Sequence, residues 1–473
     1  MKKTLLAFTA LVAASVSMGQ AHAQVAPSDD AAKTQARTIY EQIVNMDTSV
    51  EGLQTPQAAE YLAGQFIDAG FAPEDVNIIP ETIAQGPTAA LVVRYRGDGS
   101  GGDPILLLAH MDVVTAHRED WTRDPFTMVE EDGFFFGRGT LDNKAGVTLV
   151  TSTLLRWKQN GVVPSRDLIV FFSGDEELGG ATVGNVINNH RDLIEAEFAL
   201  NSDAGGGGIT EAGDPTTFNV QTAEKTFASF TWTTHNPGGH SSRPRRDNAI
   251  YDLADALDRL RAYEFPVMYN ETTLASMEAV APLESGEIKR ALERFVAHPG
   301  DRRAAARLSE EPGYIGQVRT TCVPTLLSAG HADNALPQSA TATVNCRIFP
   351  GVEVEDVQAV LQEIAGPEVE IAPLDEYWAA PASPLRDDVF AAVRVALDAI
   401  HPETPISPGM SAGATDGKYF RAIGIPVYGV SGLFIKSSDA YAHGLNERLP
   451  VASFYDGLVF WDAMLNELAG PAE

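Results

Sequence analysis

Continuous apolar runs alternate with amphipathic stretches along the first half of the chain. Residues 104–109 and 167–172 are apolar almost throughout, which is typical of strands buried on both faces of a sheet. Residues 147–158 between them have helical spacing, and residues 197–200 form a third short strand candidate. The strand–helix–strand order favours a right-handed crossover. The predicted fold class is therefore α/β, a mostly parallel sheet with flanking helices.

The pattern changes near Thr222. Residues 227–233 alternate like a strand with one exposed face, and residues 248–263 are helical. The α/β pattern returns with a helix over residues 383–400 and a buried strand over residues 426–430. We therefore expect a smaller α+β domain inserted into the α/β domain. The predicted segments are 1–23 as a signal peptide, 24–222 as the first part of the α/β domain, 223–376 as the insert, and 377–473 as the second part.

The first residues have the layout of a secretory signal peptide. Lys2 and Lys3 precede an apolar run from Leu5 to about Met18, and Ala21-His22-Ala23 has the form of a cleavage site. The run is shorter than the about 20 residues that span a bilayer. We expect cleavage after Ala23, a periplasmic or secreted mature protein, and no membrane association once the signal is removed.

The charge balance excludes some partners. The chain has 34 Lys and Arg residues against 64 Asp and Glu residues, a formal net charge of −30. A surface this acidic repels phosphate backbones and anionic lipids, so nucleic acid is not an expected partner.

The two cysteines occupy comparable positions in two strand-like runs. Cys322 adjoins residues 323–329, and Cys346 lies within residues 340–349. If the runs pair as an antiparallel hairpin centred near Asn334, the cysteines lie directly opposite each other, at a Cα separation of about 4.5 Å that a disulfide tolerates. Two buried free thiols are the alternative, and the spacing leaves both open.

Five short segments place imidazole or carboxyl groups at strand ends or in nearby polar loops. In open α/β sheets the functional site lies beyond the carboxyl ends of the strands. Each segment alone has an ordinary explanation, such as a solvated loop, but together they form a mixed nitrogen and oxygen set that suits Zn²⁺. The segments are His110-Met111-Asp112, Asp142-Asn143-Lys144, Asp175-Glu176-Glu177, Ser202-Asp203 and Ala442-His443-Gly444.

Local geometry suggests separate roles within two of these segments. Residues 110 and 112 of an extended segment point the same way, so His110 can bind a metal while Asp112 accepts its other N–H. Adjacent side chains point apart, so one of Glu176 and Glu177 can bind metal while the other takes a proton from water.

The same segments carry a resemblance to the co-catalytic zinc metallopeptidases of the M20 family, which includes aminoacylase, carboxypeptidases G and S, succinyl-diaminopimelate desuccinylase and carnosinase. The resemblance extends over the whole mature chain, in the family's order and spacing. The matching stretches are residues 108–114, 121–126, 137–146, 174–177, 202–205 and 238–242.

The resemblance implies two Zn²⁺ ions per subunit, although Mn²⁺ or Co²⁺ would fit the same ligands. Glu176 would be the general base that takes a proton from the metal-bridging water and delivers it to the leaving amine, with Asp112 behind the ligands. The implied ligands are Asp142 as the bridge, His110 and Asp203 at one ion, and Glu177 and His443 at the other.

The insert would then be the family's lid and dimerisation domain, and a homodimer could form through it. Residues 273–308 make it longer than the minimal lid. From the residues alone, Arg347 could equally be a surface salt bridge and Asn334 a turn residue. The implied substrate-binding residues are His240, which would reach the partner subunit's site, Asn334, Arg347 as a grip on the substrate carboxylate, and Gly413 and Ala414 through backbone N–H groups.

The function that these features predict is hydrolysis of an amide or peptide bond beside a free carboxylate, in a small peptide substrate. Deacylation of an N-acyl amino acid is the alternative, and a non-catalytic binding protein on the same fold is a remote one. Residues 409–413 match the G-x-S-x-G pattern of serine hydrolases. Pro402, Pro405 and Pro408 argue against a central strand before Ser411 and so against that class.

Overall fold

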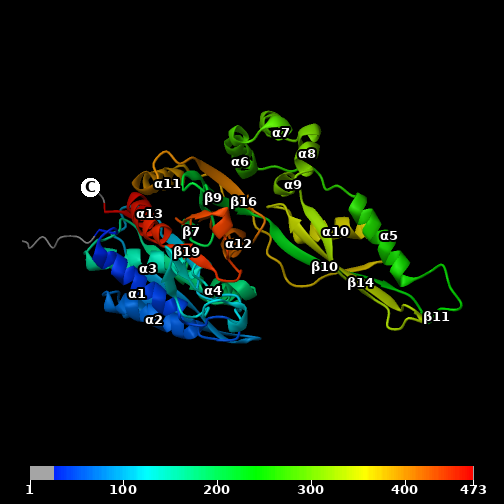
Figure 1. Ribbon diagram of the computed structural model, residues 1–473, viewed down its shortest axis with the longest axis horizontal. Coiled ribbons are helices and arrows are strands. Elements are labelled where there is room, and N and C mark those ends of the chain that lie inside the picture. Colours follow the sequence, from blue (N-terminus) through cyan, green and yellow to red (C-terminus); the bar gives the residue numbers. More distant parts are fainter. Residues whose placement is uncertain (1–25, 472–473) are drawn as a thin grey trace, which may run out of the picture.

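The computed structural model describes residues 26–471, so the expected signal peptide lies outside the described residues. None of the helices in that part of the chain is long and apolar enough to cross a membrane. Figure 1 shows two parts: a large α/β part that holds both the first and the last of the described residues, and an elongated part built on a second sheet.

A ten-stranded sheet forms the core of the large part, in the order β1-β2-β6-β3-β7-β17-β9-β8-β18, with β16 paired to β9. Its central strands β6, β3, β7 and β17 are parallel, which confirms the predicted mostly parallel sheet. The strands are β1 (Val76–Ile83), β2 (Gly86–Tyr95), β3 (Ile105–His110), β6 (Leu168–Ser173), β7 (Phe198–Asn201), β8 (Gly206–Ile209), β9 (Pro215–Glu224), β16 (Ile406–Ser411), β17 (Val427–Gly429) and β18 (Phe434–Lys436).

Helices cover both faces of this sheet, which explains why its central strands are apolar without alternation. Leu107 packs in the core under one helical layer, and its neighbours Leu106 and Leu108 pack under the other. The first layer contains α1 (Asp30–Val44), α2 (Thr55–Asp68), α3 (Lys144–Gln159), α11 (Asp387–Ile400) and α13 (Val451–Ala469); the second contains α4 (Ala181–Asn189) and α12 (Gly417–Ala422).

The helix expected over residues 383–400 begins only at Asp387, so its predicted start was wrong. Ser383 instead belongs to the segment that returns from the second sheet. Its backbone N–H donates to the Thr222 carbonyl at 2.8 Å, and its hydroxyl donates to the Val427 carbonyl at 2.9 Å. These contacts hold the segment that returns to the large sheet beside the segment that leaves it.

The second sheet is antiparallel, in the order β12-β14-β10-β15. Its inner face packs against α5 (Ala249–Ala262) and α10 (Val354–Ala365), around Phe230 and Trp232. Cys322 and Cys346 are direct partners in the β12–β14 register and form a disulfide, so the hairpin prediction is confirmed over the free thiols. The strands are β12 (Thr321–Ala329), β14 (Ser339–Ile348), β10 (Thr226–His235) and β15 (Glu370–Pro373).

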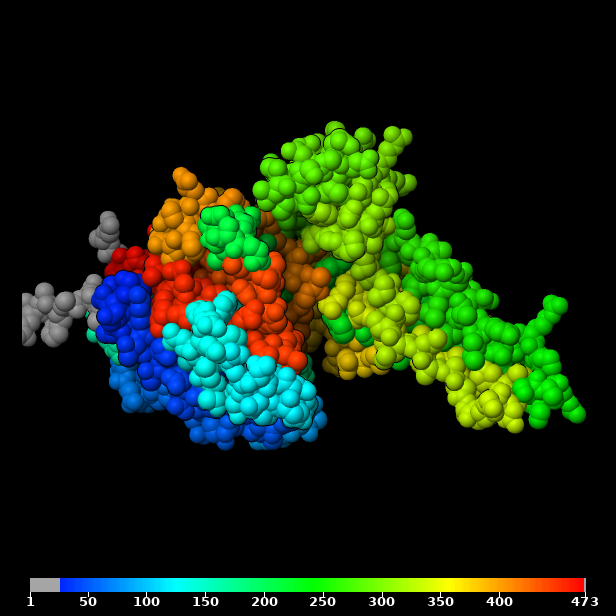
Figure 2. Space-filling view, viewed as in Figure 1, coloured from blue at the N-terminus to red at the C-terminus, as the bar shows by residue number. Residues whose placement is uncertain are grey.

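Four short helices form a further cluster with its own apolar core around Leu292 and Phe295. They account for the helix-prone stretch at residues 273–308. The space-filling view shows the two parts meeting in the middle of the molecule, with this cluster above the junction (Figure 2). The helices are α6 (Glu271–Val280), α7 (Gly286–Ala297), α8 (Arg302–Ser309) and α9 (Pro312–Val318).

Two small sheets complete the fold. One joins β19 (Arg448–Pro450), β5 (Phe134–Phe136) and β4 (Val129–Glu131) beside the large sheet. The other pairs β11 (Gly239–His240) with β13 (Ala335–Leu336) at the tip of the second sheet (Figure 1). The second sheet and the helical cluster lie within the predicted insert 223–376, whose exact boundaries stay a prediction.

Candidate active site

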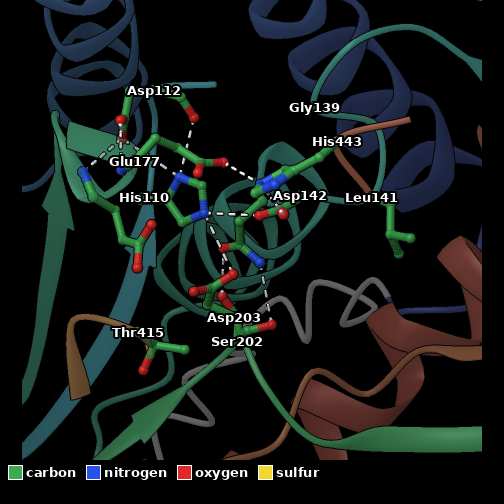
Figure 3. A network of polar contacts seen from close by, with 12 residues as sticks. His110, Asp112, Gly139, Leu141, Asp142, Glu177, Ser202, Asp203, Thr415 and His443 are labelled. Atoms are coloured by element: carbon green, nitrogen blue, oxygen red, sulfur yellow. Dashed lines mark hydrogen bonds and ion pairs between the residues drawn. The ribbon is translucent and has the colours of Figure 1, made fainter. Parts of the chain in front are cut away.

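The acid and imidazole groups meet at the carboxyl edge of the parallel strands. His110 is the last residue of β3, Asp203 follows β7, and Glu176 and Glu177 lie in a short 3₁₀ helix, η3 (Glu176–Leu178), after β6. Because parallel strands end at one edge of a sheet, their following loops converge there. Asp142, just before α3, and His443, in the loop before β19, complete the group (Figure 3).

Asp142 is shared between two sets of donor atoms. Its Oδ1 lies 2.9 Å from His110 Nε2, which is also 3.3 Å from Asp203 Oδ1. Its Oδ2 lies 3.1 Å from His443 Nε2, which is 2.8 Å from Glu177 Oε1. Within each set the donor atoms lie no more than 4.8 Å apart, so each set could hold a metal ion. The donor chemistry and the shared carboxylate fit a two-metal centre.

The protonation behaviour of the group reflects crowded negative charge. Burial raises the pKa of Asp203 to about 7, and burial also raises the pKa of Glu176 well above its ordinary value. Burial opposes ionisation of Asp142 as well, but hydrogen bonds from His110 and His443 lower the pKa of that carboxyl. Hydrogen bonds to Asp142 and Glu177 raise the pKa of His443 to about 10. A positive charge near these carboxyl groups favours their ionised forms, and bound cations would provide such a charge.

Asp112 orients the two glutamates more directly than it orients His110. Its carboxylate accepts the backbone N–H groups of Glu176 and Glu177, each at 3.1 Å. His110 Nδ1 lies 3.0 Å from the Asp112 backbone carbonyl and 3.4 Å from its carboxylate. The imidazole nitrogen therefore lies closer to the Asp112 backbone carbonyl than to the side chain that was predicted to accept its N–H.

Asp175, the first acid of the predicted triple, has a structural role. It is buried, and its carboxylate accepts the backbone N–H groups of Ala181 at 2.6 Å and Thr182 at 3.0 Å, at the start of α4. This leaves Glu176 and Glu177 free to face the cavity.

Glu447 is a residue of the site that sequence reasoning missed. It is completely buried and accepts the backbone N–H groups of Leu141 at 2.7 Å and Asp142 at 3.0 Å, together with the Arg138 guanidinium at 2.6 Å. Arg138 also donates to the His443 carbonyl at 3.4 Å, where the His443 backbone has a left-handed φ of 62°. The sequence shows no sign of this pairing, because 309 positions separate the partners.

Asp416, two residues after Ala414, is a second residue that sequence reasoning missed. It is 5% exposed, the Ser173 hydroxyl donates to one of its oxygens, and the other has no partner among the described residues. Burial raises its pKa to about 7, and its charge in turn raises the pKa of Glu176. Asp416 is thus a buried acid behind the general-base candidate.

A cavity of about 550 Å³ opens beside the acidic group. Gly413 and Ala414 line it, while their binding of substrate stays a prediction, and Ser276 of α6 and Gln317 of α9 bring the helical cluster to its wall. The Gly413 N–H, expected to face a substrate carboxylate, donates instead to the Ser411 hydroxyl at 3.0 Å.

Arg347 lies at this loop rather than in a surface salt bridge. Its guanidinium donates to the Ala412 carbonyl at 2.7 Å and sits 4.8 Å from the centre of the Phe227 ring. Among the described residues no carboxylate pairs with Arg347, so its guanidinium keeps donors for a ligand.

His240 and Asn334 lie together, but far from the acids of their own chain. Both are exposed at the tip of the second sheet, where the Ser241 N–H donates to the Asn334 carbonyl at 3.0 Å (Figure 1). The structure therefore does not bring them to the acidic group within one chain. The prediction for His240 concerns the partner subunit's site and stays a prediction.

The strand that precedes Ser411 is an edge strand, so the expectation that no central strand lies there is confirmed. Residues Ile406–Ser411 form β16 and include Pro408. β16 pairs only with β9, and its other edge is free, where a missing N–H has little cost. The Ser411 hydroxyl accepts from Gly413, and no described imidazole lies within hydrogen-bond distance of it. The serine therefore lacks the base that the rival class needs.

Comparisons with known proteins relate the chain to one peptidase family. Residues 106–467 match the model described as "Peptidase family M20/M25/M40". The N-fatty-acyl-amino acid synthase/hydrolase PM20D1 of Xenopus tropicalis is 31% identical over 366 residues, covering 75% of this chain and 70% of the relative. Aminoacylase-1 of Sus scrofa is 24% identical over 452 residues, covering 91% and 95%. The M20 family metallo-carboxypeptidase Sso-CP2 from Sulfolobus solfataricus shares the fold with a TM-score of 0.68 at 17% identity, covering 92% and 99%.

Proposed function

The chain belongs to peptidase family M20/M25/M40, and on that basis we propose that it hydrolyses the amide bond of N-acyl amino acids, dipeptides included, at a two-metal centre. The observation that carries the proposal is the position of Asp142, whose two carboxylate oxygens face separate donor sets. A dipeptide is an N-acyl amino acid whose acyl group carries an amine, so one site can serve both substrate types.

Five residues would hold the two ions: Asp142 between them, His110 and Asp203 on one side, and Glu177 and His443 on the other. When bound, zinc or a similar divalent ion supplies positive charge that polarises the substrate carbonyl and makes water more acidic. Asp112 fixes the backbone of both glutamates, so the ligand Glu177 and its neighbour Glu176 keep a constant relation.

Glu176 acts as the proton carrier. Its carboxylate takes a proton from the attacking water and then gives it to the leaving nitrogen. Its burial and the nearby charges of Asp203 and Asp416 raise its pKa, which makes it a better base than an exposed glutamate.

The free carboxylate of the substrate would bind Arg347, beside the loop that carries Ala414. A guanidinium grips a carboxylate with two parallel hydrogen bonds, and Arg347 has no carboxylate partner of its own among the described residues. The similarity to PM20D1 and aminoacylase-1, whose names refer to acyl-amino acids, favours N-acyl amino acids over longer peptides.

A homodimer through the second sheet is part of this proposal. β12 is an edge strand with exposed Val323, Leu326 and Leu327, at 55%, 69% and 68% exposure, and such an edge can pair with another chain. His240 lies in β11, in the small sheet at the tip of the second sheet and far from its own acidic site, so it could act only in trans. A periplasmic or secreted location is likewise proposed, and the Cys322–Cys346 disulfide is compatible with such an oxidising compartment.

Turnover of a substrate panel tests the proposal. We expect metal-loaded protein to hydrolyse N-acetyl amino acids and dipeptides, and to leave the methyl ester of the same N-acetyl amino acid intact at its amide bond. The Arg347→Met variant should lose the distinction between acid and ester mainly through KM. A chelator should stop turnover, while a serine-directed phosphonate should not. Equal amide cleavage of acid and ester would overturn the proposed carboxylate recognition.

A further inference from the structure

A second pocket adjoins the acidic cavity at Ala414, which lines both. It has a volume of about 430 Å³ and lies where residues 224–227 leave the large sheet and residues 375–380 return. Leu178 and Gly179, which directly follow the ligand candidate Glu177, form part of its wall. A group bound in this pocket would therefore be next to the reaction centre.

Four aromatic side chains contribute apolar surface to a pocket whose lining is otherwise largely polar. Phe227 and Tyr377 have ring centroids 6.3 Å apart, and Trp378 and Tyr419 have centroids 5.3 Å apart. Phe227 and Leu178 are each 42% exposed, so part of the apolar surface of each side chain is open to a ligand.

Both tyrosine hydroxyls in the lining are already used by the protein. Tyr377 donates to the Ser229 carbonyl at 3.0 Å, and Tyr419 donates to the Gly179 carbonyl at 2.6 Å. These two rings therefore offer carbon surface to a ligand, rather than polar groups.

The charged residues around the pocket include both signs. Glu224 is paired with Arg421 at 2.8 Å, and the Lys225 amine donates to two backbone carbonyls. Lys418 stands on the same wall as two solvent-exposed acids. These acids are Asp375 and Glu376.

The pocket also lies beside the group that would hold the substrate carboxylate. Phe227 and Arg347 are direct partners in the β10–β14 register, and the Arg347 guanidinium lies 4.8 Å from the centre of the Phe227 ring. In an amino acid the carboxylate and the side chain share one carbon atom. A carboxylate bound to Arg347 therefore places the side chain within reach of the aromatic walls.

We propose that this pocket binds the side chain of the amino acid released by hydrolysis, and that it selects aromatic and large apolar side chains. The inference rests on the proposed function, because it takes the carboxylate at Arg347 as given. It narrows the substrate class to N-acyl derivatives of residues such as phenylalanine, tryptophan and leucine.

The test compares kcat/KM for N-acetylphenylalanine, N-acetylglycine and N-acetyllysine in the full metal-loaded chain. We expect kcat/KM for N-acetylphenylalanine to exceed kcat/KM for N-acetylglycine by about tenfold or more. Burial of a few additional carbon atoms supplies discrimination of this size. Phe227→Ala and Trp378→Ala should each reduce this phenylalanine-to-glycine ratio severalfold. Tyr269→Ala, an exposed aromatic elsewhere at 47% exposure, is the matched control and should leave the ratio unchanged.

The ratio separates a specificity role from a general loss of activity, since damage to the fold lowers both rates together. An unchanged ratio in both pocket variants would overturn the inference, as would a preference for N-acetyllysine. If no panel member is hydrolysed, the proposed function fails. Calorimetric measurement of ligand binding then tests whether the pocket binds the amino acid side chain. Tighter binding of N-acetylphenylalanine than of N-acetylglycine, lost in Trp378→Ala, would support the pocket, and equal binding would reject it.

Discussion

Arg138 and Glu447 form a buried ion pair, with 2.6 Å between Nη1 and Oε2, that joins the two loops carrying Asp142 and His443. Glu447 accepts the Asp142 N–H, and Arg138 donates to the His443 carbonyl. The pair thus holds the shared metal ligand and the most exposed one, His443, in a fixed relation. Neither charged side chain lines the cavity, so their effect on activity is one of positioning.

Weakening the Arg138–Glu447 ion pair should lower the affinity for metal more than it lowers the turnover of the metal-loaded protein. Arg138→Lys keeps the positive charge but loses the fork that reaches both Glu447 and the His443 loop. We expect metal affinity to fall about tenfold to a hundredfold, the usual effect of changing groups that support metal ligands. Chelator competition measures this affinity, and Glu467→Gln on the exposed side of α13 is a control.

Glu447→Gln should also lower metal affinity. It should destabilise the fold more than Arg138→Lys does, because it leaves Arg138 buried without a charged partner. Thermal unfolding of both variants separates the two effects. Wild-type metal affinity in folded Arg138→Lys protein would contradict the positioning role.

Glu176→Gln should bind metal normally and lose turnover. The amide cannot take a proton from water, and general-base catalysis contributes about 10²–10⁴ in rate. We expect kcat to fall by that amount at an unchanged metal content. Glu363→Gln on α10, an exposed glutamate, provides the control. Turnover within about threefold of wild type would require another base.

Lys225 should make stability depend on pH. It is 2% exposed, and burial lowers its pKa to about 7. In the unfolded chain the amine keeps its proton until about pH 10.4. Between these values the unfolded state binds one more proton, so the free energy of unfolding rises with pH by up to about 1.4 kcal/mol per pH unit from this residue. The effect is absent below pH 7, where both states are protonated.

Lys225→Met should remove this rise of the free energy of unfolding with pH. Urea unfolding between pH 7.5 and pH 9 measures it, because the wild-type and variant curves differ only by the Lys225 contribution. Lys289→Met on α7 serves as the control. Parallel curves for wild type and Lys225→Met would show that the buried amine does not titrate in this range.

Reduction of the disulfide should destabilise the second sheet. The bond closes a loop with a sequence separation of 24, for which loop-closure entropy gives about 3 kcal/mol. Cys322→Ser with Cys346→Ser should lower the unfolding temperature, and reductant should do the same to the wild type but not to the variant. The chain has only these two cysteines, so reductant has no other target. Equal unfolding temperatures with and without reductant would contradict this expectation.

The sequence was sufficient to predict the positions of those residues that follow a regular pattern along the chain. The apolar runs ending at His110 and before Glu176 identified two central strands, and the strand-end rule then placed their polar residues at one edge. The opposed cysteines followed from counting along a hairpin. Each of these inferences depends on neighbours in the chain or on strand periodicity, both of which a sequence displays.

The rest depended on contacts between distant segments. Glu447 looks like any loop acid until the fold places it against Arg138, and Asp416 becomes a buried acid only beside Ser173. The strand at Pro408 was missed because an edge position removes the cost of proline, and edge positions are known only from the sheet order. The Gly413 N–H was assigned to substrate because its closer acceptor, Ser411, requires a local turn that residue types do not specify.

The most direct test of the account is a metal titration of chelator-treated protein, with hydrolysis of N-acetylphenylalanine measured at each step. The shared position of Asp142 predicts two equivalents of Zn²⁺ bound per chain and full activity only near the second equivalent. Glu176→Gln should bind the same two equivalents without turnover. Activity that persists in metal-free protein, or saturates at one equivalent, would contradict the two-metal account.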